Sequence, residues 1–198
     1  MIEVLAALSA SAAGGMRIAL PLLLIGLLRE DLWFRVPYLS HVSPQLVIGI
    51  LVSWSLFELF ASKKLLGQRI LQIVQLVFSP LVGAIMGMAI AEATEVPEPL
   101  FVNLIGIVGG LLALVLQLVQ AGWFYRLRGL PVWVILIQDA LCISLVLFAL
   151  DAPQQGGLIA LLLLWLAIRS SKEWYRWYVS QAPAPERTHP RRHKQDPD

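Results

Sequence analysis

The chain has 198 residues, of which 58% are hydrophobic and 14% are charged, with a formal net charge of +2 and a mean hydropathy of +0.75. A soluble domain carries nearer one quarter charged residues, so this composition excludes an ordinary soluble protein and predicts an integral membrane protein. The long apolar runs do not alternate, which favours helices over a closed barrel. We therefore predict an all-α polytopic membrane helical bundle, with residues 1–180 forming one domain.

Six transmembrane helices are predicted. The first, about residues 2–28, spans roughly 40 Å at 1.5 Å per residue and exceeds the roughly 30 Å hydrocarbon core, so it must tilt or break at Gly14-Gly15. We expect it to be retained, because it lacks the positively charged start of a signal peptide. The tail, residues 181–198, has no apolar face and is predicted to be disordered. The other helices are expected at Pro44–Ser62, Leu65–Ala91 with a kink at Pro80, Leu100–Phe124, Pro131–Leu150, and from Leu158 beyond Trp165.

Lysines and arginines are unevenly distributed. In a six-helix arrangement both termini lie on one side, and that side carries all of the 15 Lys and Arg residues except Arg17, Arg29 and Arg35. Because cytoplasmic loops are enriched in Lys and Arg, we predict a multi-pass protein with both termini in the cytoplasm. Five spans, with the first helix not crossing, is the alternative.

The two halves of the chain resemble each other. In each half a glycine pair lies in the first helix, a proline opens the second, and an acid follows: Gly14-Gly15, Pro44 and Glu58, then Gly109-Gly110, Pro131 and Asp139. This pattern predicts two inverted three-helix repeats, which are typical of transporters whose broken helices line the site. Coincidence is the alternative, because the acid spacing differs. The glycines are also explained by close helix packing.

Five polar side chains are predicted to meet in the inner half of the membrane: Arg17, Glu58, Asp139, Gln117 and Gln120. An arginine inside a span costs about 2.5–3.5 kcal/mol on insertion scales, so Arg17 needs a partner. Helix rise places Glu58 roughly 6 Å and Asp139 roughly 12 Å from the cytoplasmic ends of their helices. A polar cavity for an ion, a proton or a small anion is one interpretation, and an ion pair that fixes helix packing is the other. The stripe Gln68, Gln72 and Gln75 is predicted to face the membrane interface.

The run SASAAGGMRIALPLLLIGLL at residues 9–28 resembles the opening of a family of small bacterial membrane proteins, catalogued as domain of unknown function four-one-two-six. Further matches are Ser43-Pro44 before Phe57-Glu58, Ser79-Pro80 before Gly83, and Pro131 with Asp139. The resemblance covers roughly residues 5–170 and implies the membrane fold, in a bacterial inner membrane, without implying an activity. The chain departs from the family at Ala61-Ser62-Lys63, where an Asp usually precedes the Lys.

The sequence leaves two functions open. The first is a small transporter or channel-like protein for an ion or small solute, and the second is a scaffold or assembly factor of a membrane complex. No metal spacing, phosphate loop or nucleophile motif is present, and the histidines lie outside the spans, so we expect neither an enzyme nor a cofactor. The expected partners are the lipid bilayer and a second copy or another membrane protein, and no nucleic acid.

Overall fold

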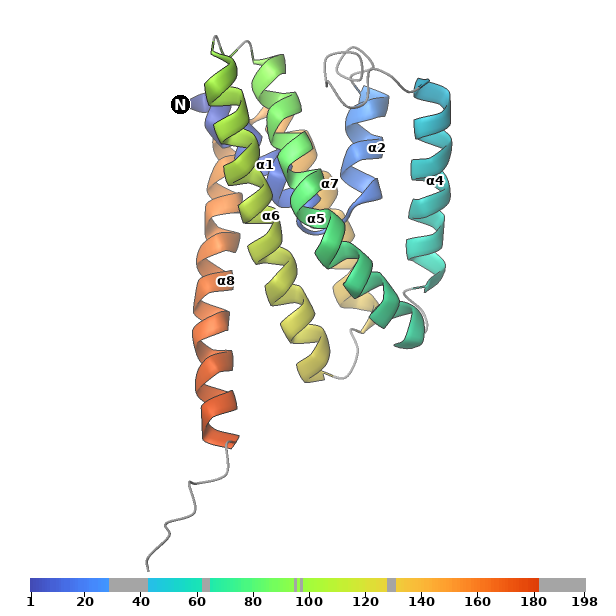
Figure 1. The fold of residues 1–198 in the computed structure, drawn as a ribbon, viewed down its shortest axis with the longest axis vertical. Coiled ribbons are helices and arrows are strands. Elements are labelled where there is room, and N and C mark those ends of the chain that lie inside the picture. The colour runs from blue at the N-terminus through green and yellow to red at the C-terminus, as the bar shows by residue number, and fades with distance from the viewer. Residues whose placement is uncertain (29–42, 62–64, 95, 97, 128–130, 182–198) are drawn as a thin grey trace, which may run out of the picture.

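The computed structural model describes residues 1–28, 43–61, 65–94, 96, 98–127 and 131–181. Within these ranges the chain is helical, without strands, which confirms the all-α class. The stretches Gly67–Ala93, Pro99–Phe124 and Trp133–Asp151 are long and apolar enough to cross a membrane, and the other apolar helices are shorter. The helices are α1 (Ile2–Gly14), α2 (Ala19–Leu28), α4 (Pro44–Ala61), α5 (Leu65–Ala93), α6 (Pro99–Leu127), α7 (Val132–Asp151) and α8 (Pro153–Gln181) (Figure 1).

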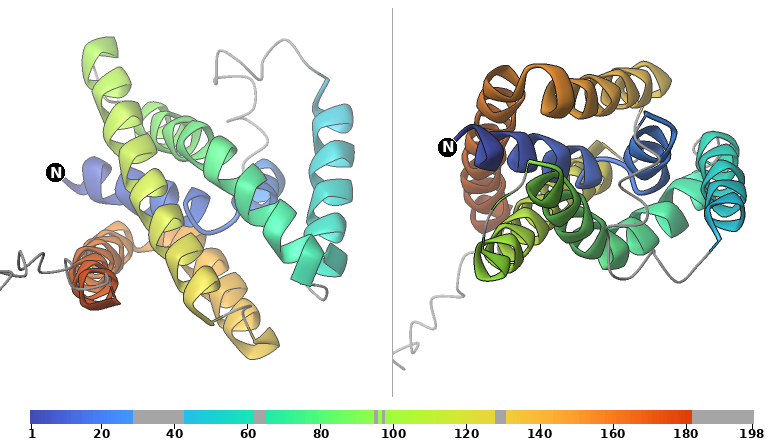
Figure 2. Two further views of the ribbon diagram at one scale, coloured as in Figure 1. Left: turned by 60° about the horizontal axis from the view of Figure 1, so that its bottom comes forward. Right: turned by 90° about the horizontal axis from the view of Figure 1, so that it is seen from above.

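Helix α1 lies in the middle of the bundle and contacts α5, α6, α7 and α8 (Figure 2). Its residues from Ala6 to Gly14 are small apart from Leu8, and this lets the surrounding backbones approach closely. Two buried serines tie it to its neighbours: Ser9 Oγ donates to the Leu145 carbonyl at 2.7 Å, and Ser11 Oγ donates to the Gly83 carbonyl at 2.8 Å. A helix made of small residues thus forms the centre of the core.

The first helix does not cross the bundle. Helix α1 runs obliquely from one end to the middle, where Gly15 packs against the Ala113 backbone of α6. After the break at residues 15–18 the chain turns back, and α2 returns beside α4, with Ala19 and Leu51 buried together. Met1 and the far end of α2 therefore lie toward the same end of the bundle (Figure 1).

Helices α4 to α8 then alternate in direction, so Met1 lies near one end of the bundle and Gln181 lies at the other (Figure 1). The turn after Gly15 places the described ends of the chain at opposite ends of the bundle, as in the five-span alternative. The number of helices that cross the membrane and the side of each terminus stay predictions. We name the two ends by their charges. The basic end carries Arg69, Arg126, Arg169, Lys172 and Arg176, and the acidic end carries Glu3, Glu92, Glu98 and Asp151.

The predicted break at Gly109-Gly110 is absent, and α5 stays helical through Pro80, where a kink was predicted. Helix α6 runs without interruption through the glycine pair, and α5 continues through Pro80 with a bend along its path (Figure 1). A Cβ on Gly110 would lie 2.7 Å from the Pro80 carbonyl oxygen, so these glycines serve the close packing of α5 on α6. The first half of the chain therefore opens with a broken helix that turns back and the second with a continuous one, which gives the predicted inverted repeat no support. The predicted disordered tail lies almost wholly outside the described residues.

Candidate functional site

Arg17 lies in the break between α1 and α2, where the chain is not helical. Its Nε donates to Asp139 Oδ1 of α7 at 2.6 Å, and its Nη1 lies 3.9 Å from Glu58 Oε2 of α4. The side chains of Arg17 and Glu58 are 8% and 4% exposed, and that of Asp139 is 21% exposed. The sequence left open which acid pairs with Arg17, and the structure places it between both.

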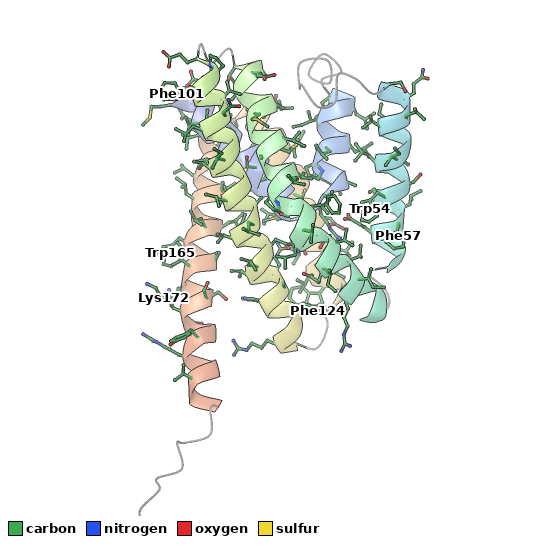
Figure 3. The ribbon with its side chains drawn as sticks, in the orientation of Figure 1. Trp54, Phe57, Phe101, Phe124, Trp165 and Lys172 are labelled. Atoms are coloured by element: carbon green, nitrogen blue, oxygen red, sulfur yellow. The ribbon has the colours of Figure 1, made fainter. Side chains whose placement is uncertain are left out.

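Glu58 receives two further hydrogen bonds. Its Oε1 accepts from Trp54 Nε1 at 3.0 Å and from Gln75 Nε2 of α5 at 3.2 Å. Trp54 lies one turn before Glu58 on α4 and points into the bundle (Figure 3). A buried carboxylate is tolerated only when it is paired and hydrogen-bonded, and these donors with Arg17 meet that requirement. Trp54 was not among the predicted site residues, although its i, i+4 spacing to Glu58 is visible in the sequence.

Three buried glutamines from α5 and α6 extend the cluster. Gln117 Nε2 of α6 lies 3.2 Å from Gln72 Oε1 and 3.4 Å from Gln75 Oε1. Gln72 and Gln75 are 8% and 4% exposed, so the prediction that they face the membrane interface is wrong. They are buried because α5 turns this stripe toward α6, where Gln117 supplies the complementary amide.

Gln138 was not among the predicted site residues. It links Gln120, the last of the five predicted polar residues, to the connection between α1 and α2. Its Nε2 lies 2.9 Å from Gln120 Oε1 and 2.8 Å from the Met16 carbonyl oxygen in the α1–α2 connection. That carbonyl belongs to a segment with no helical partner, so a side-chain donor satisfies it. In the sequence, the position of Gln138 directly before Asp139 was the signal that could have placed it in the site.

A cavity of about 30 Å³ lies on the basic-end side of Arg17. A water molecule needs roughly 10–15 Å³ of such volume, so the cavity holds about two. On the opposite side Ser79 Oγ donates to the Ala113 carbonyl at 3.2 Å and Cys142 packs against Ala13, both fully buried. The cluster therefore faces the basic end and is sealed from the acidic end. The cavity is lined by Arg17, Gln68, Leu71, Gln72, Gln75, Phe124, Ile135 and Gln138.

The formal charges of the cluster do not cancel. Arg17 contributes one positive charge, and Glu58 and Asp139 contribute two negative charges when both are ionised. The cluster therefore holds more carboxylates than cationic side chains, and its excess of negative charge suits a small cation better than an anion.

Antiparallel apolar helices, three of them long enough to cross a membrane, pack around a buried arginine and two acids, which indicates a membrane protein. The chain belongs to the family described as Domain of unknown function (DUF4126), which matches residues 4–173. This confirms the resemblance expected from the sequence, and the match includes Arg17, Glu58 and Asp139. No curated protein and no solved structure matches the chain.

Proposed function

We propose that the protein moves protons or a small cation across the membrane, with Asp139 and Glu58 as the carrying groups and Arg17 as their fixed counter-ion. The observation that carries the proposal is the unbalanced buried cluster beside a glutamine-lined cavity. Ionisable residues inside a membrane are expensive and mark ion or proton paths by default. The non-helical break at Arg17 supports this function, because interrupted helices line the sites of many transporters.

The size and charge of the site favour a proton or bare cation over a larger solute or an anion. The cavity is about 30 Å³, well below the roughly 300–1,000 Å³ of typical small-molecule pockets. Two carboxylates bracket the guanidinium of Arg17, which leaves little positive potential for an anion.

One observation favours the alternative, a non-transporting scaffold of a membrane complex. The 2.6 Å contact between Arg17 and Asp139 is a direct ion pair that joins the α1–α2 break to α7. A direct pair of this kind serves to fix helix positions without any cargo. The two functions differ in whether the purified protein alone carries a flux.

Asp139→Asn should reduce the flux of protons or cations by about a hundredfold, the low end of the range for removing a positioned proton-transfer group. The measurement is decay of an imposed pH gradient, and of Na⁺ or K⁺ gradients, in liposomes containing the purified protein. Asp151→Asn is the matched control, because Asp151 is an exposed acid at the end of the same helix. Absence of any flux with the wild-type protein, or equal flux in both variants, would favour the scaffold.

We also infer that the basic end faces the cytoplasm, because Lys and Arg concentrate there among the described residues. The N-terminus then lies on the other side and the end of α8 in the cytoplasm, in place of the predicted arrangement with both termini cytoplasmic. Residence in a bacterial inner membrane stays a prediction from the family resemblance.

Cysteines introduced by Glu3→Cys and Arg176→Cys should react differently with a membrane-impermeant maleimide added to whole cells. Glu3→Cys should be labelled directly, and Arg176→Cys only after permeabilisation. The wild-type protein is the control, because its single cysteine, Cys142, is fully buried and should stay unlabelled. Equal labelling of both variants in intact cells would contradict the inferred orientation.

A further inference from the structure

A groove of about 260 Å³ lies between the last turns of α6 and the second half of α8, away from the charged cluster. The two helices diverge toward the basic end (Figure 1). Trp123 bridges the groove, because its Nε1 donates to Ser170 Oγ at 2.7 Å. Gly122 forms part of the wall, and a Cβ placed on it would meet no atom within 4 Å. The lining residues are Leu118, Val119, Gly122, Trp123, Arg126, Ser170 and Ser171.

The groove crosses the depth at which both helices change from apolar to polar. On α6 its wall passes from Leu118 and Val119 to Arg126. On α8 the apolar run ends at Ile168, directly before Arg169 and the groove residue Ser170. Tryptophan is enriched at the boundary between hydrocarbon and headgroups, and Trp123 lies within this region of the groove. One end of the groove therefore lies at acyl-chain depth and the other at headgroup depth.

The charge and polarity of the groove select its occupant. Arg126 is an exposed cation on the polar side of the groove, while Trp165 and Lys172 project from α8 away from α6 (Figure 3). Ser170 Oγ accepts from Trp123, so its own hydroxyl can donate to an anionic oxygen. An acyl chain with a phosphate at its end matches both the narrow apolar part and the basic rim.

We propose that this groove binds one anionic phospholipid. Its acyl chain lies along Leu118 and Val119, and its phosphate is held by Arg126 and the Ser170 hydroxyl. The site is separate from the Arg17 cluster and does not depend on any flux through it.

The test is native mass spectrometry of the full-length protein in mild detergent, titrated with phosphatidylglycerol or with zwitterionic phosphatidylcholine. One phosphatidylglycerol per chain should bind ahead of phosphatidylcholine. Arg126→Gln should weaken phosphatidylglycerol binding by about fivefold, the factor equivalent to one basic residue at an anionic membrane surface. Gly122→Leu should remove the bound lipid by filling the groove.

Gly49→Leu is the matched control, because Gly49 is an exposed glycine on α4 with no atom within 4 Å of its added Cβ. It should bind phosphatidylglycerol as the wild-type protein does. Equal retention of both lipids, or unchanged binding in both Gly122→Leu and Arg126→Gln, would overturn the proposal. A change from dimer to monomer in Gly122→Leu, with no lipid bound to the wild-type protein, would also overturn it and assign the groove to a second copy.

Discussion

Arg17→Ala should lower the free energy of unfolding by about 3–5 kcal/mol, the usual cost of removing one partner of a buried ion pair. The cost is large because one guanidinium serves two acids. Without it, Glu58 and Asp139 face each other in a site whose remaining hydrogen-bond donors to Glu58 are Trp54 and Gln75. The connection between α1 and α2 would also lose its ion pair with α7.

The measurement for this prediction is reversible unfolding of the purified protein in mixed micelles. Arg169→Ala is the matched control, since Arg169 is 64% exposed and its pair with Glu173 is 3.7 Å long. A surface pair of this kind contributes about 0–1 kcal/mol. Adding Glu58→Gln and Asp139→Asn to Arg17→Ala should recover much of the stability, because no buried charge then lacks a partner. Equal effects of Arg17→Ala and Arg169→Ala would show that the cluster does not hold the fold.

The cluster was largely predictable because depth in a membrane follows from counting residues along helices. A helix rises about 1.5 Å per residue, so the positions of Glu58, Asp139 and Gln117 within their helices fixed their level. The cost of a charge in lipid then required Arg17 to meet an acid. What the count does not give is rotation about the helix axis. For this reason Gln72 and Gln75 were predicted to face the membrane interface. In the structure α5 turns them inward against Gln117.

The path of the first segment was not predictable from local sequence. Residues 2–28 are mostly apolar, so their composition suits both a tilted span and a helix that turns back. The path depends on packing against residues distant in the sequence, because Gly14 and Gly15 at the end of α1 pack closely against Gly83 of α5 and Ala113 of α6. Similarly, Gly109-Gly110 has the composition of a break, yet its backbone hydrogen bonds stay within α6 while its missing side chains admit α5.

Gly83→Ala should destabilise the protein by about 1–3 kcal/mol, the usual cost of adding volume to a packed core. An added Cβ would overlap the Cβ of Ala113 and lie 2.9 Å from the Gly109 carbonyl oxygen. Neither neighbour is the end of a flexible side chain, so relief requires a shift of α5 against α6. That shift would also disturb α1, because Ser11 Oγ donates to the Gly83 carbonyl and a Cβ on Gly14 would lie 3.2 Å from Gly83 Cα.

The control for this substitution is Gly49→Ala, which should be neutral or stabilising by up to about 1 kcal/mol, because alanine favours helix and no atom opposes it. The comparison is made by the same unfolding assay. A loss at Gly83 that exceeds any change at Gly49 shows that contact between α1, α5 and α6 holds the turned-back segment. Because α1 leads directly to Arg17, Gly83→Ala should also lower proton or cation flux, even though Gly83 touches none of the charged residues. Wild-type stability in Gly83→Ala would mean that α5 and α6 pack less tightly than their glycines indicate.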